Sequence, residues 1–269
     1  MIAELLANAP VFILIAARAL VMIEIAPIIS SESVPQMAKI ALAGWTAFVV
    51  FPQAVSSGNY ALQGIEGGAF SFSFILLVIG EGVIGLILGF FLTMIFAAFS
   101  TGGQFFSLQM GFGASETFDP LAQIENPLMG QFLNLIAMLI FLVTDGLRNL
   151  FLTGFFRSIE AINIVKLVEG REALFKMMAG GLSGLFLNAM IISMPILGTL
   201  FLVSLATGLI SKAAPQINIL SEGFPISITV AFVLIYLTIP FMLEAFIAIL
   251  NSGFTSLETL YSALNPAAL

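Results

Sequence analysis

The chain has 269 residues, of which 60% are hydrophobic and only 9% are charged, and its net charge is −7. A soluble domain carries about 25% charged residues, so much of this protein's surface must face lipid or other subunits. Cys and His are both absent, which excludes disulfides, metal sites built on Cys or His, and catalysis by a nucleophile–histidine pair. The acidic balance argues against binding to nucleic acid. We therefore expect a membrane protein that is not an enzyme and holds no cofactor or metal.

Six apolar stretches predict an all-α, multi-span protein with kinked helices and helical hairpins. The stretches cover residues 10–29, 37–50, 70–100, 128–143, 177–211 and 224–250. The second is expected to end in a turn at Phe51-Pro52. The third is too long for the ~30 Å hydrocarbon core, so it must tilt, kink or extend beyond the membrane. The fifth contains Pro195 and is either one kinked span or a helical hairpin.

The basic residues predict an orientation. Five of the eight lie between the fourth and fifth stretches: Arg148, Arg157, Lys166, Arg171 and Lys176. Because cytoplasmic loops carry an excess of Lys and Arg, we expect segment 145–176 in the cytoplasm. Segment 101–127 is then expected on the opposite side or inside the protein.

A run of glycines in the third stretch resembles a nucleotide-binding loop only in its spacing. Residues 80–85 read Gly-Glu-Gly-Val-Ile-Gly, but the apolar pattern continues through them and no acidic residue follows about 20 positions later. We interpret Gly82, Gly85 and Gly89 instead as a face of small residues that lets another helix approach closely.

Four charged residues interrupt the apolar stretches: Arg18, Glu24, Glu81 and Glu244. A charge facing lipid is costly, so each is expected to face protein or water. Functionally, they would form a proton or ion relay. Structurally, they would make hydrogen bonds or ion pairs with other subunits or lie near the membrane edge. Arg18 and Glu24 are six positions apart and do not share a helical face, so their partners are expected elsewhere.

Segment 102–127 separates two apolar stretches without becoming an ordinary polar loop. Gly111 and Gly113 flank Phe112, and Met110 precedes them, which predicts a flexible apolar tip. Non-helical backbone at membrane depth is tolerated only inside protein or along a cavity. The segment is therefore either a constriction that closes a pore or a re-entrant turn that only connects helices.

Short motifs spread over nearly the whole chain resemble the FliR family of flagellar export-gate proteins, which is homologous to the T subunit of virulence-type injectisomes. The motifs are residues 18–27, 33–39, Gly103-Gln104, 108–113, Asp119-Pro120, Pro127, 130–132, Asp145-Gly146, 213–218 and 223–225. Each motif is short, but their combination in this order is specific.

The resemblance implies a single export-gate domain over residues 1–269, with N-terminal helices in 1–100, a plug-like loop in 101–127 and C-terminal helices in 128–269. It implies a helical hetero-oligomeric gate in which one such subunit joins five P-type and four Q-type subunits. The B-type switch subunit, the A-type export subunit, membrane lipid and exported unfolded proteins are the other expected partners. The expected location is the bacterial inner membrane at the flagellar basal body, extending to the periplasmic side.

The resemblance also implies a role for the loop in closing the central channel. Met110 and Phe112 would supply the apolar seal, while Gly111 and Gly113 would let the loop move. The expected plug residues are Leu108, Gln109, Met110, Gly111, Phe112, Gly113, Asp119 and Pro120.

Two other hypotheses remain open from the residues alone. One is a secondary transporter for a small solute that uses Glu81 or Glu244 as its coupling site. The other is a purely structural scaffold, in which the sequence of the 102–127 loop would not matter for export.

Overall fold

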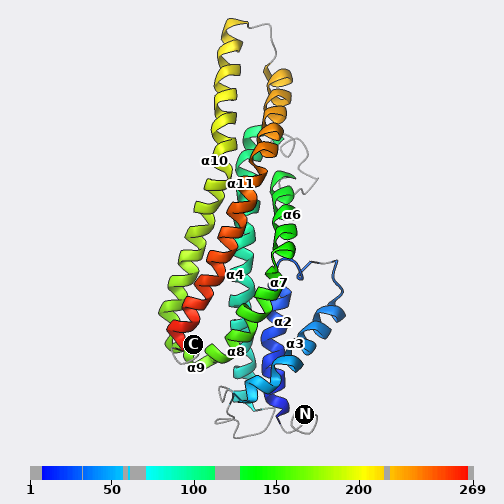
Figure 1. Cartoon of the computed structure of the whole chain (residues 1–269), viewed down its shortest axis with the longest axis vertical. Helices are drawn as coiled ribbons and strands as arrows, with labels where there is room; N and C mark the ends of the chain where they lie inside the picture. Colours follow the sequence, from blue (N-terminus) through cyan, green and yellow to red (C-terminus); the bar gives the residue numbers. More distant parts are fainter. Residues whose placement is uncertain are drawn as a thin grey trace. The chain divides into compact units, whose positions relative to one another are not determined.

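The computed structural model describes residues 8–31, 33–56, 60, 71–112, 128–214 and 219–265, and these form helices and short connections without a β-strand (Figure 1). The described helices are α2 (Ala9–Ile25), α3 (Gln36–Ser56), α4 (Phe72–Met110), α6 (Leu128–Val143), α7 (Gly146–Asn149), the π-helix η1 (Leu150–Phe156), α8 (Arg157–Ala161), α9 (Ile164–Glu169), α10 (Arg171–Ala213) and α11 (Ile219–Leu264). The all-α prediction is confirmed for these residues.

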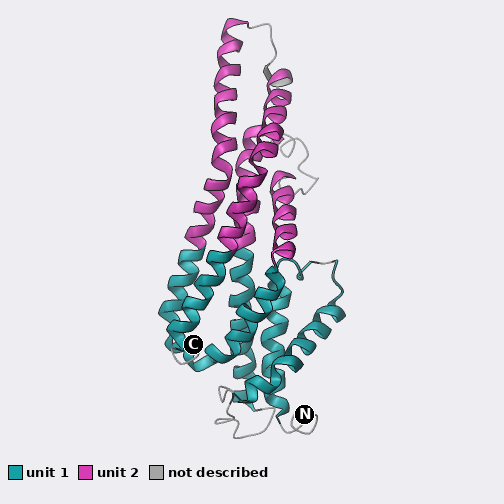
Figure 2. Ribbon diagram, viewed as in Figure 1, with its two compact units in different colours: residues 1–94, 145–181, 251–269 teal, residues 95–144, 182–250 magenta. Residues whose placement is uncertain are grey.

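The chain divides into two compact units, drawn in different colours in Figure 2. Unit 1 comprises residues 1–94, 145–181 and 251–269, and unit 2 comprises residues 95–144 and 182–250. Helices α4, α10 and α11 each contribute residues to both units.

The N-terminal part of unit 1 is a pair of packed helices, α2 and α3. Helix α2 buries Val11, Leu14, Ile15, Ala19 and Met22, a spacing of three or four residues that puts them on one face. In α3, every buried residue but one is apolar, and the exception is Lys39. The α2 face therefore packs as the helical periodicity of its sequence dictates.

A second part of unit 1 follows the bend after α6. Asp145, at this bend, has a left-handed φ of 55°. The π-helix η1 follows soon after. The hydroxyl of Tyr261, near the end of α11, donates to the Gly154 carbonyl of this π-helix at 2.6 Å. The Asn265 side chain donates to the Glu160 carbonyl at 3.1 Å, so α11 closes this part of unit 1.

Unit 2 has an aromatic core. Phe96 of α4 packs edge-to-face against Phe141 of α6 and Phe246 of α11, with ring centroids 5.4 and 5.9 Å apart. Phe99 packs against the same Phe246 at 4.6 Å. Such pairs add about 0.5–1.5 kcal/mol each beyond the burial of their area, so these rings join three helices of the unit.

Three predicted boundaries are corrected by the structure. Helix α3 continues through Pro52 to Ser56, so Phe51-Pro52 is not a turn. Helix α4 does not end near Ser100 but continues to Met110, so the first ten residues of the expected 101–127 loop are helical. Helix α10 is one helix that includes Pro195, which decides against the hairpin alternative.

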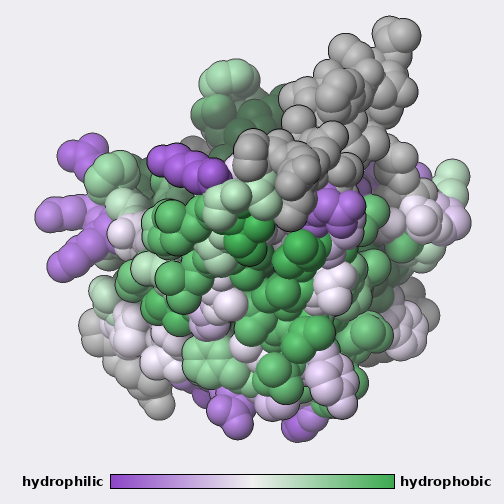
Figure 3. Space-filling view, turned by 90° about the horizontal axis from the view of Figure 1, so that it is seen from above, coloured by the Kyte–Doolittle hydropathy of each residue, from purple (hydrophilic) through white to green (hydrophobic). Residues whose placement is uncertain are grey.

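Four helices of the described residues are long and apolar enough to span a membrane, and the bent pair 128–143 and 146–161 makes a fifth if it is one span. The 39, 43 and 46 residues of α4, α10 and α11 far exceed the ~20 residues that a span requires. Large apolar side chains remain exposed on α10 and α11, among them Leu209, Tyr236 and Leu237. Figure 3 shows hydrophobic side chains gathered in the middle of the face that it views, with hydrophilic ones mainly toward its edge.

Candidate functional site

The predicted plug segment begins in the last turn of α4. Leu108 is 63% exposed, whereas Met110 is completely buried. Gly111 ends the helix with a φ of +94°, and its N–H donates to the Leu108 carbonyl at 3.1 Å. This backbone conformation favours glycine because a side chain there meets its own backbone. Gly113, Asp119 and Pro120 of the predicted plug lie outside the described residues.

Helices α4 and α6, which precede and follow the plug segment, touch through their backbones. A Cβ on Gly103 would lie 2.5 Å from the Met129 carbonyl oxygen and 2.7 Å from the Cα of Gly130. A Cβ on Gly130 would in turn lie 2.9 Å from the Ser100 carbonyl oxygen. Close packing of this kind compensates for the low helix propensity of glycine, which explains why α4 stays helical through this region.

Helices α10 and α11 contact the end of α4 as well. The Gln109 side chain donates from Nε2 to the Ser204 hydroxyl of α10 at 3.4 Å. The ring of Phe224 in α11 covers Gly111 so closely that a Cβ on this glycine would lie 2.2 Å from Cδ1 of the ring. The first residues of the predicted plug are therefore held from two sides within unit 2.

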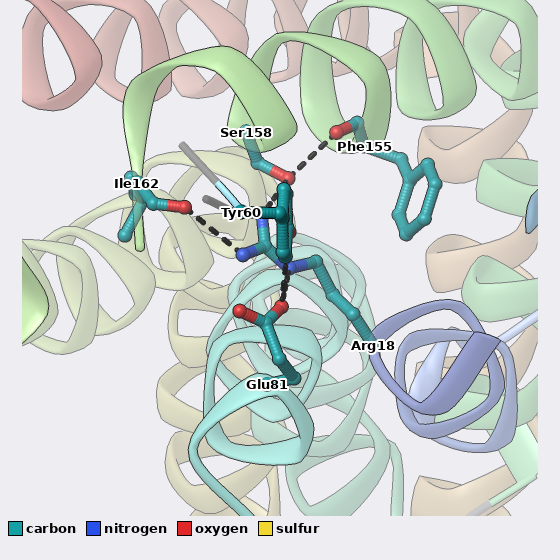
Figure 4. A network of polar contacts seen from close by, with 6 residues as sticks. All are labelled: Arg18, Tyr60, Glu81, Phe155, Ser158 and Ile162. Carbon is teal, nitrogen blue, oxygen red and sulfur yellow. Dashed lines mark hydrogen bonds and ion pairs between the residues drawn. The ribbon is translucent and has the colours of Figure 1, made fainter. Parts of the chain in front are cut away.

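A separate, buried charge network lies in unit 1 (Figure 4). The Arg18 guanidinium donates from Nε to Glu81 Oε2 at 2.6 Å, from one terminal nitrogen to the Ser158 hydroxyl at 3.0 Å, and from the other to the Ile162 carbonyl at 2.9 Å. Arg18 is completely buried and Glu81 is 3% exposed. All three nitrogens of the guanidinium thus have a partner, as a buried charge requires.

Two hydroxyl groups complete the network. The Tyr60 hydroxyl donates to the same Glu81 oxygen at 3.2 Å, and Ser158 donates to the Phe155 carbonyl of the π-helix at 2.6 Å. Burial raises the pKa of the Tyr60 phenol, so the hydroxyl keeps its proton and remains a donor. The network ties α2, α4 and the segment 155–162 together by hydrogen bonds around one ion pair.

The glycine face of α4 lies against α2. A Cβ on Gly85 would lie 2.3 Å from the Arg18 carbonyl oxygen, and one on Gly89 would lie 2.7 Å from the Cβ of Ile25. At Gly82 the nearest atom, in Val21, is 3.6 Å away, which is ordinary contact. The two closest approaches bring the α2 backbone directly onto α4, and this helps to place Arg18 within reach of Glu81.

The remaining predicted charges differ in their surroundings. Glu24 accepts hydrogen bonds from Lys39 at 3.1 Å and from Gln36, both in α3. Lys39 also donates to the Ser30 carbonyl and is buried. Glu244 is exposed and makes no hydrogen bond or ion pair with the part of the chain that the structure describes.

Several partners in these contacts have little or no signal in the sequence. Tyr60 and Ser158 are ordinary polar residues in the sequence, and the Ile162 carbonyl has no sequence signal at all. Lys39 does have a sequence signal. It lies just after the polar segment that follows α2, within reach of Glu24 near the end of that helix. Phe224 is one of 27 phenylalanines, so its position over Gly111 depends on the fold.

Taken together, the long apolar helices, the thinly charged surface and the intrachain charge pairs define an α-helical membrane protein of several spans. The chain matches the family model described as "Bacterial export proteins, family 1" over residues 9–253. It therefore belongs to this family of bacterial export proteins.

Relatives of known name support this membership. The chain is 28% identical to the flagellar biosynthetic protein FliR of Bacillus subtilis over 257 residues, which cover 95% of each chain. It is 31% identical to FliR of Escherichia coli over 227 residues, covering 83% of this chain and 82% of the relative. It is also 27% identical to the surface presentation of antigens protein SpaR of Shigella flexneri over 185 residues, covering 68% and 70%. None of these three names denotes an enzyme.

Proposed function

We propose that this chain is a subunit of the type III protein export gate and forms part of the channel through which unfolded flagellar proteins cross the bacterial inner membrane. The family match over residues 9–253 is the observation on which this proposal chiefly rests. The flagellar names of the FliR relatives favour flagellar proteins as the cargo.

Within the gate, we assign the segment that starts at Leu108 to closing the channel. Three properties of its described part support this role. It begins in the last turn of a long apolar helix, it contains a glycine with positive φ at residue 111, and it exposes the large apolar side chain of Leu108. Met110 is completely buried in this structure, so in this role it anchors the segment, and any seal that it supplies requires it to leave the core.

The expected partners are the P-type, Q-type, B-type and A-type export subunits. The long, exposed apolar faces of α10 and α11 suit contacts with such subunits, because helices of 43 and 46 residues have more length than the hydrocarbon core can cover. The same excess supports an extension beyond the hydrocarbon core, and we place the chain at the flagellar basal body with this extension on the periplasmic side.

The transporter hypothesis receives no support from the geometry of its candidate residues. A coupling glutamate must gain and lose its counter-ion during transport. Glu81 is instead enclosed with Arg18, its carboxylate within 2.6 Å of the guanidinium. Glu244 is exposed on α11 and makes no hydrogen bond or ion pair among the described residues.

The native mass of the complex tests the assignment to the gate. The gene is expressed with the genes for the P-type and Q-type subunits, the membranes are extracted in mild detergent, and the mass of the purified complex is measured. We expect one copy of this chain inside a large hetero-oligomer. A stable monomer or homodimer in the presence of these subunits would contradict the proposal.

Deletion of residues 111–113 tests the assignment of the plug. Cells that assemble the deletion variant at the normal native mass are expected to leak small ions across the inner membrane, because the channel then lacks its closure. Ion flux is measured in the same cells and compared with wild type. Normal ion retention by a fully assembled deletion variant would show that this segment does not close the channel.

A further inference from the structure

One side of α3 carries large apolar side chains and no charge. We call it the outer face of α3, and it comprises Met37, Ala41, Gly44, Trp45 and Val49. Met37, Trp45 and Val49 are 80%, 66% and 58% exposed, and their spacing of four residues or a multiple of four places them along one side of the helix. The Cβ position of Gly44 has nothing within 4 Å. A helix in water would carry polar residues on such a side, so the outer face suits an apolar neighbour.

The buried side of α3 has small residues instead. Ala43, Ala47 and Ala54 are buried there, and α3 packs against α2. In a membrane, lipid tails are as apolar as Leu, so helices meet each other through small residues. Large apolar side chains gain nothing from leaving the lipid and can face it. The distribution of sizes around α3, small inside and large outside, is therefore the one expected for a helix between protein and lipid.

The polar groups within α3 are satisfied by the protein. Lys39 is the one charged residue of this helix, and it is only 5% exposed. Its ammonium donates to Glu24 and to the Ser30 carbonyl, each at 3.1 Å. The Thr46 hydroxyl donates to the Leu42 carbonyl of the same helix at 2.7 Å. Hydrocarbon offers no hydrogen-bond partner, so these internal contacts let the helix lie against it.

Polar clusters lie at both ends of the outer face. At one end Gln36 donates to Glu24, and at the other end Gln53 donates to Glu160 of α8. The two glutamines are 17 positions apart, which is about 26 Å along a helix that rises ~1.5 Å per residue. This length is close to the ~30 Å thickness of the hydrocarbon core. With 21 residues, α3 thus fits a bilayer, whereas α4, α10 and α11 are about twice as long.

We propose that the outer face of α3 lies directly against the acyl chains of the lipid bilayer, with Trp45 near the midplane and a polar cluster at each membrane surface. The charge pattern complements a bilayer, because an uncharged face lies between two polar clusters. Glu160 belongs to segment 145–176, which holds five of the eight basic residues, so the Gln53 end lies on the cytoplasmic side. This placement goes beyond the export role and does not depend on it.

Fluorescence quenching by brominated lipid tests the depth of this face. Trp45 is the single tryptophan of the chain. The full chain is reconstituted into phosphatidylcholine vesicles that carry bromine either near the headgroup or deep in the acyl chains. Deep bromine is expected to quench Trp45 several-fold and shallow bromine less. In a Trp45→Phe background, Met37→Trp moves the probe to the end of the face, so shallow bromine should quench it more. Equal depths for the two probes would overturn the proposal.

A buried probe in the same helix is the matched control. Phe51 is 3% exposed, so Phe51→Trp in the Trp45→Phe background is expected to be quenched little by bromine at either depth. If Trp45 is quenched no more than this control, the outer face does not meet lipid and the proposal is wrong.

The same measurement on the purified gate identifies what covers the face after assembly. The chain is co-expressed with the P-type and Q-type subunits, and gates with and without Trp45→Phe are compared to isolate the signal of Trp45. We expect the quenching of Trp45 to persist. Its loss on assembly would overturn the proposal, since a subunit helix, which can offer an acceptor to the indole N–H, then covers the face. If no gate forms, the proposed function fails, whereas the depth pattern of the chain alone still decides the placement of α3.

Introduced cysteines test the sidedness without tryptophan. The chain has no cysteine of its own, and Ser33 and Ser56 are exposed residues beyond the two ends of the outer face. A membrane-impermeant maleimide is expected to label Ser33→Cys in spheroplasts, from the periplasmic side, and Ser56→Cys in inverted vesicles. Labelling of both cysteines from the same side would overturn the proposal.

Discussion

The guanidinium of Arg18 and the carboxylate of Glu81 meet across 2.6 Å, and both side chains are enclosed by protein. The two residues come from different helices 63 positions apart. A buried pair is sensitive to loss of one partner, because the other is then left as an uncompensated charge. This relationship makes the pair a structural element of unit 1 and the basis of the first prediction.

Arg18→Met is expected to destabilise the isolated chain by about 3–5 kcal/mol, since it leaves the Glu81 carboxylate buried without its cation. The double variant Arg18→Met with Glu81→Met removes both charges and is expected to recover most of that loss. Thermal unfolding in detergent measures both effects. A double variant that is no more stable than Arg18→Met would show that the pair is not coupled in this way.

Two buried serines are expected to respond in opposite directions to the same substitution. Ser158 accepts from Arg18 and donates to the Phe155 carbonyl, so Ser158→Ala should cost about 1–3 kcal/mol by leaving buried groups unsatisfied. The hydroxyl of Ser107 is buried and has no hydrogen-bond partner within the described ranges. Ser107→Ala is therefore expected to be neutral or stabilising in the same unfolding measurement. Equal losses from the two variants would contradict this assignment of hydrogen bonds.

Two glycines inside helices of unit 1 offer a similar comparison. Gly85→Ala places a methyl group 2.3 Å from the Arg18 carbonyl oxygen, and overpacking against backbone is expected to cost about 1–3 kcal/mol. Gly44→Ala meets nothing within 4 Å and is expected to stabilise α3 by up to about 1 kcal/mol through its higher helix propensity. The measurement is unfolding of the isolated chain, before other subunits cover the surface. A stabilising Gly85→Ala would show that α2 is not packed against α4 at this glycine.

Glu244→Gln distinguishes a contact with another subunit from a role within the chain. The residue is exposed and lacks a partner among the described residues, so the substitution is expected to change the stability of the isolated chain by no more than about 0.5 kcal/mol. As a proposed subunit contact, it is expected to lower the yield of the assembled gate at unchanged levels of this chain. Quantitative native electrophoresis of the co-expressed subunits measures the yield. An unchanged yield would remove Glu244 from the set of subunit contacts.

The all-α class of the fold was predictable because it follows from the length of the apolar runs, which can be read directly from the sequence. Long apolar runs with so few charges must become helices in a membrane-like environment, since every backbone group needs an internal hydrogen bond there. The fourth stretch, 128–143, was predicted with the boundaries that the structure has. It is short, uncharged and bounded by Pro127 before it and by the Thr-Asp-Gly turn after it.

Other boundaries were not predictable because local signals competed with packing. Gly102 and Gly103 are poor helix formers, and the apolar run that predicted the helix ends at Ser100. Helix α4 nevertheless continues to Met110, because these glycines let α6 and α10 approach within contact distance of its backbone. Pro52 likewise lies inside α3, four residues before the helix ends at Ser56, although a proline within a helix removes one backbone donor.

By itself, the sequence determined that this protein is an all-helical membrane protein without Cys or His chemistry, and its ordered motifs indicated the export family. Only the tertiary structure decided which charges are paired. Arg18 joined Glu81, Ser158 and the Ile162 carbonyl, Glu24 joined Lys39, and Glu244 stayed exposed. The physical reason is the sequence distance over which each interaction acts. Hydropathy and helix propensity act within one turn or one span. A buried charge instead pairs with any matching group that folding brings within about 3 Å, however far away it is in the sequence.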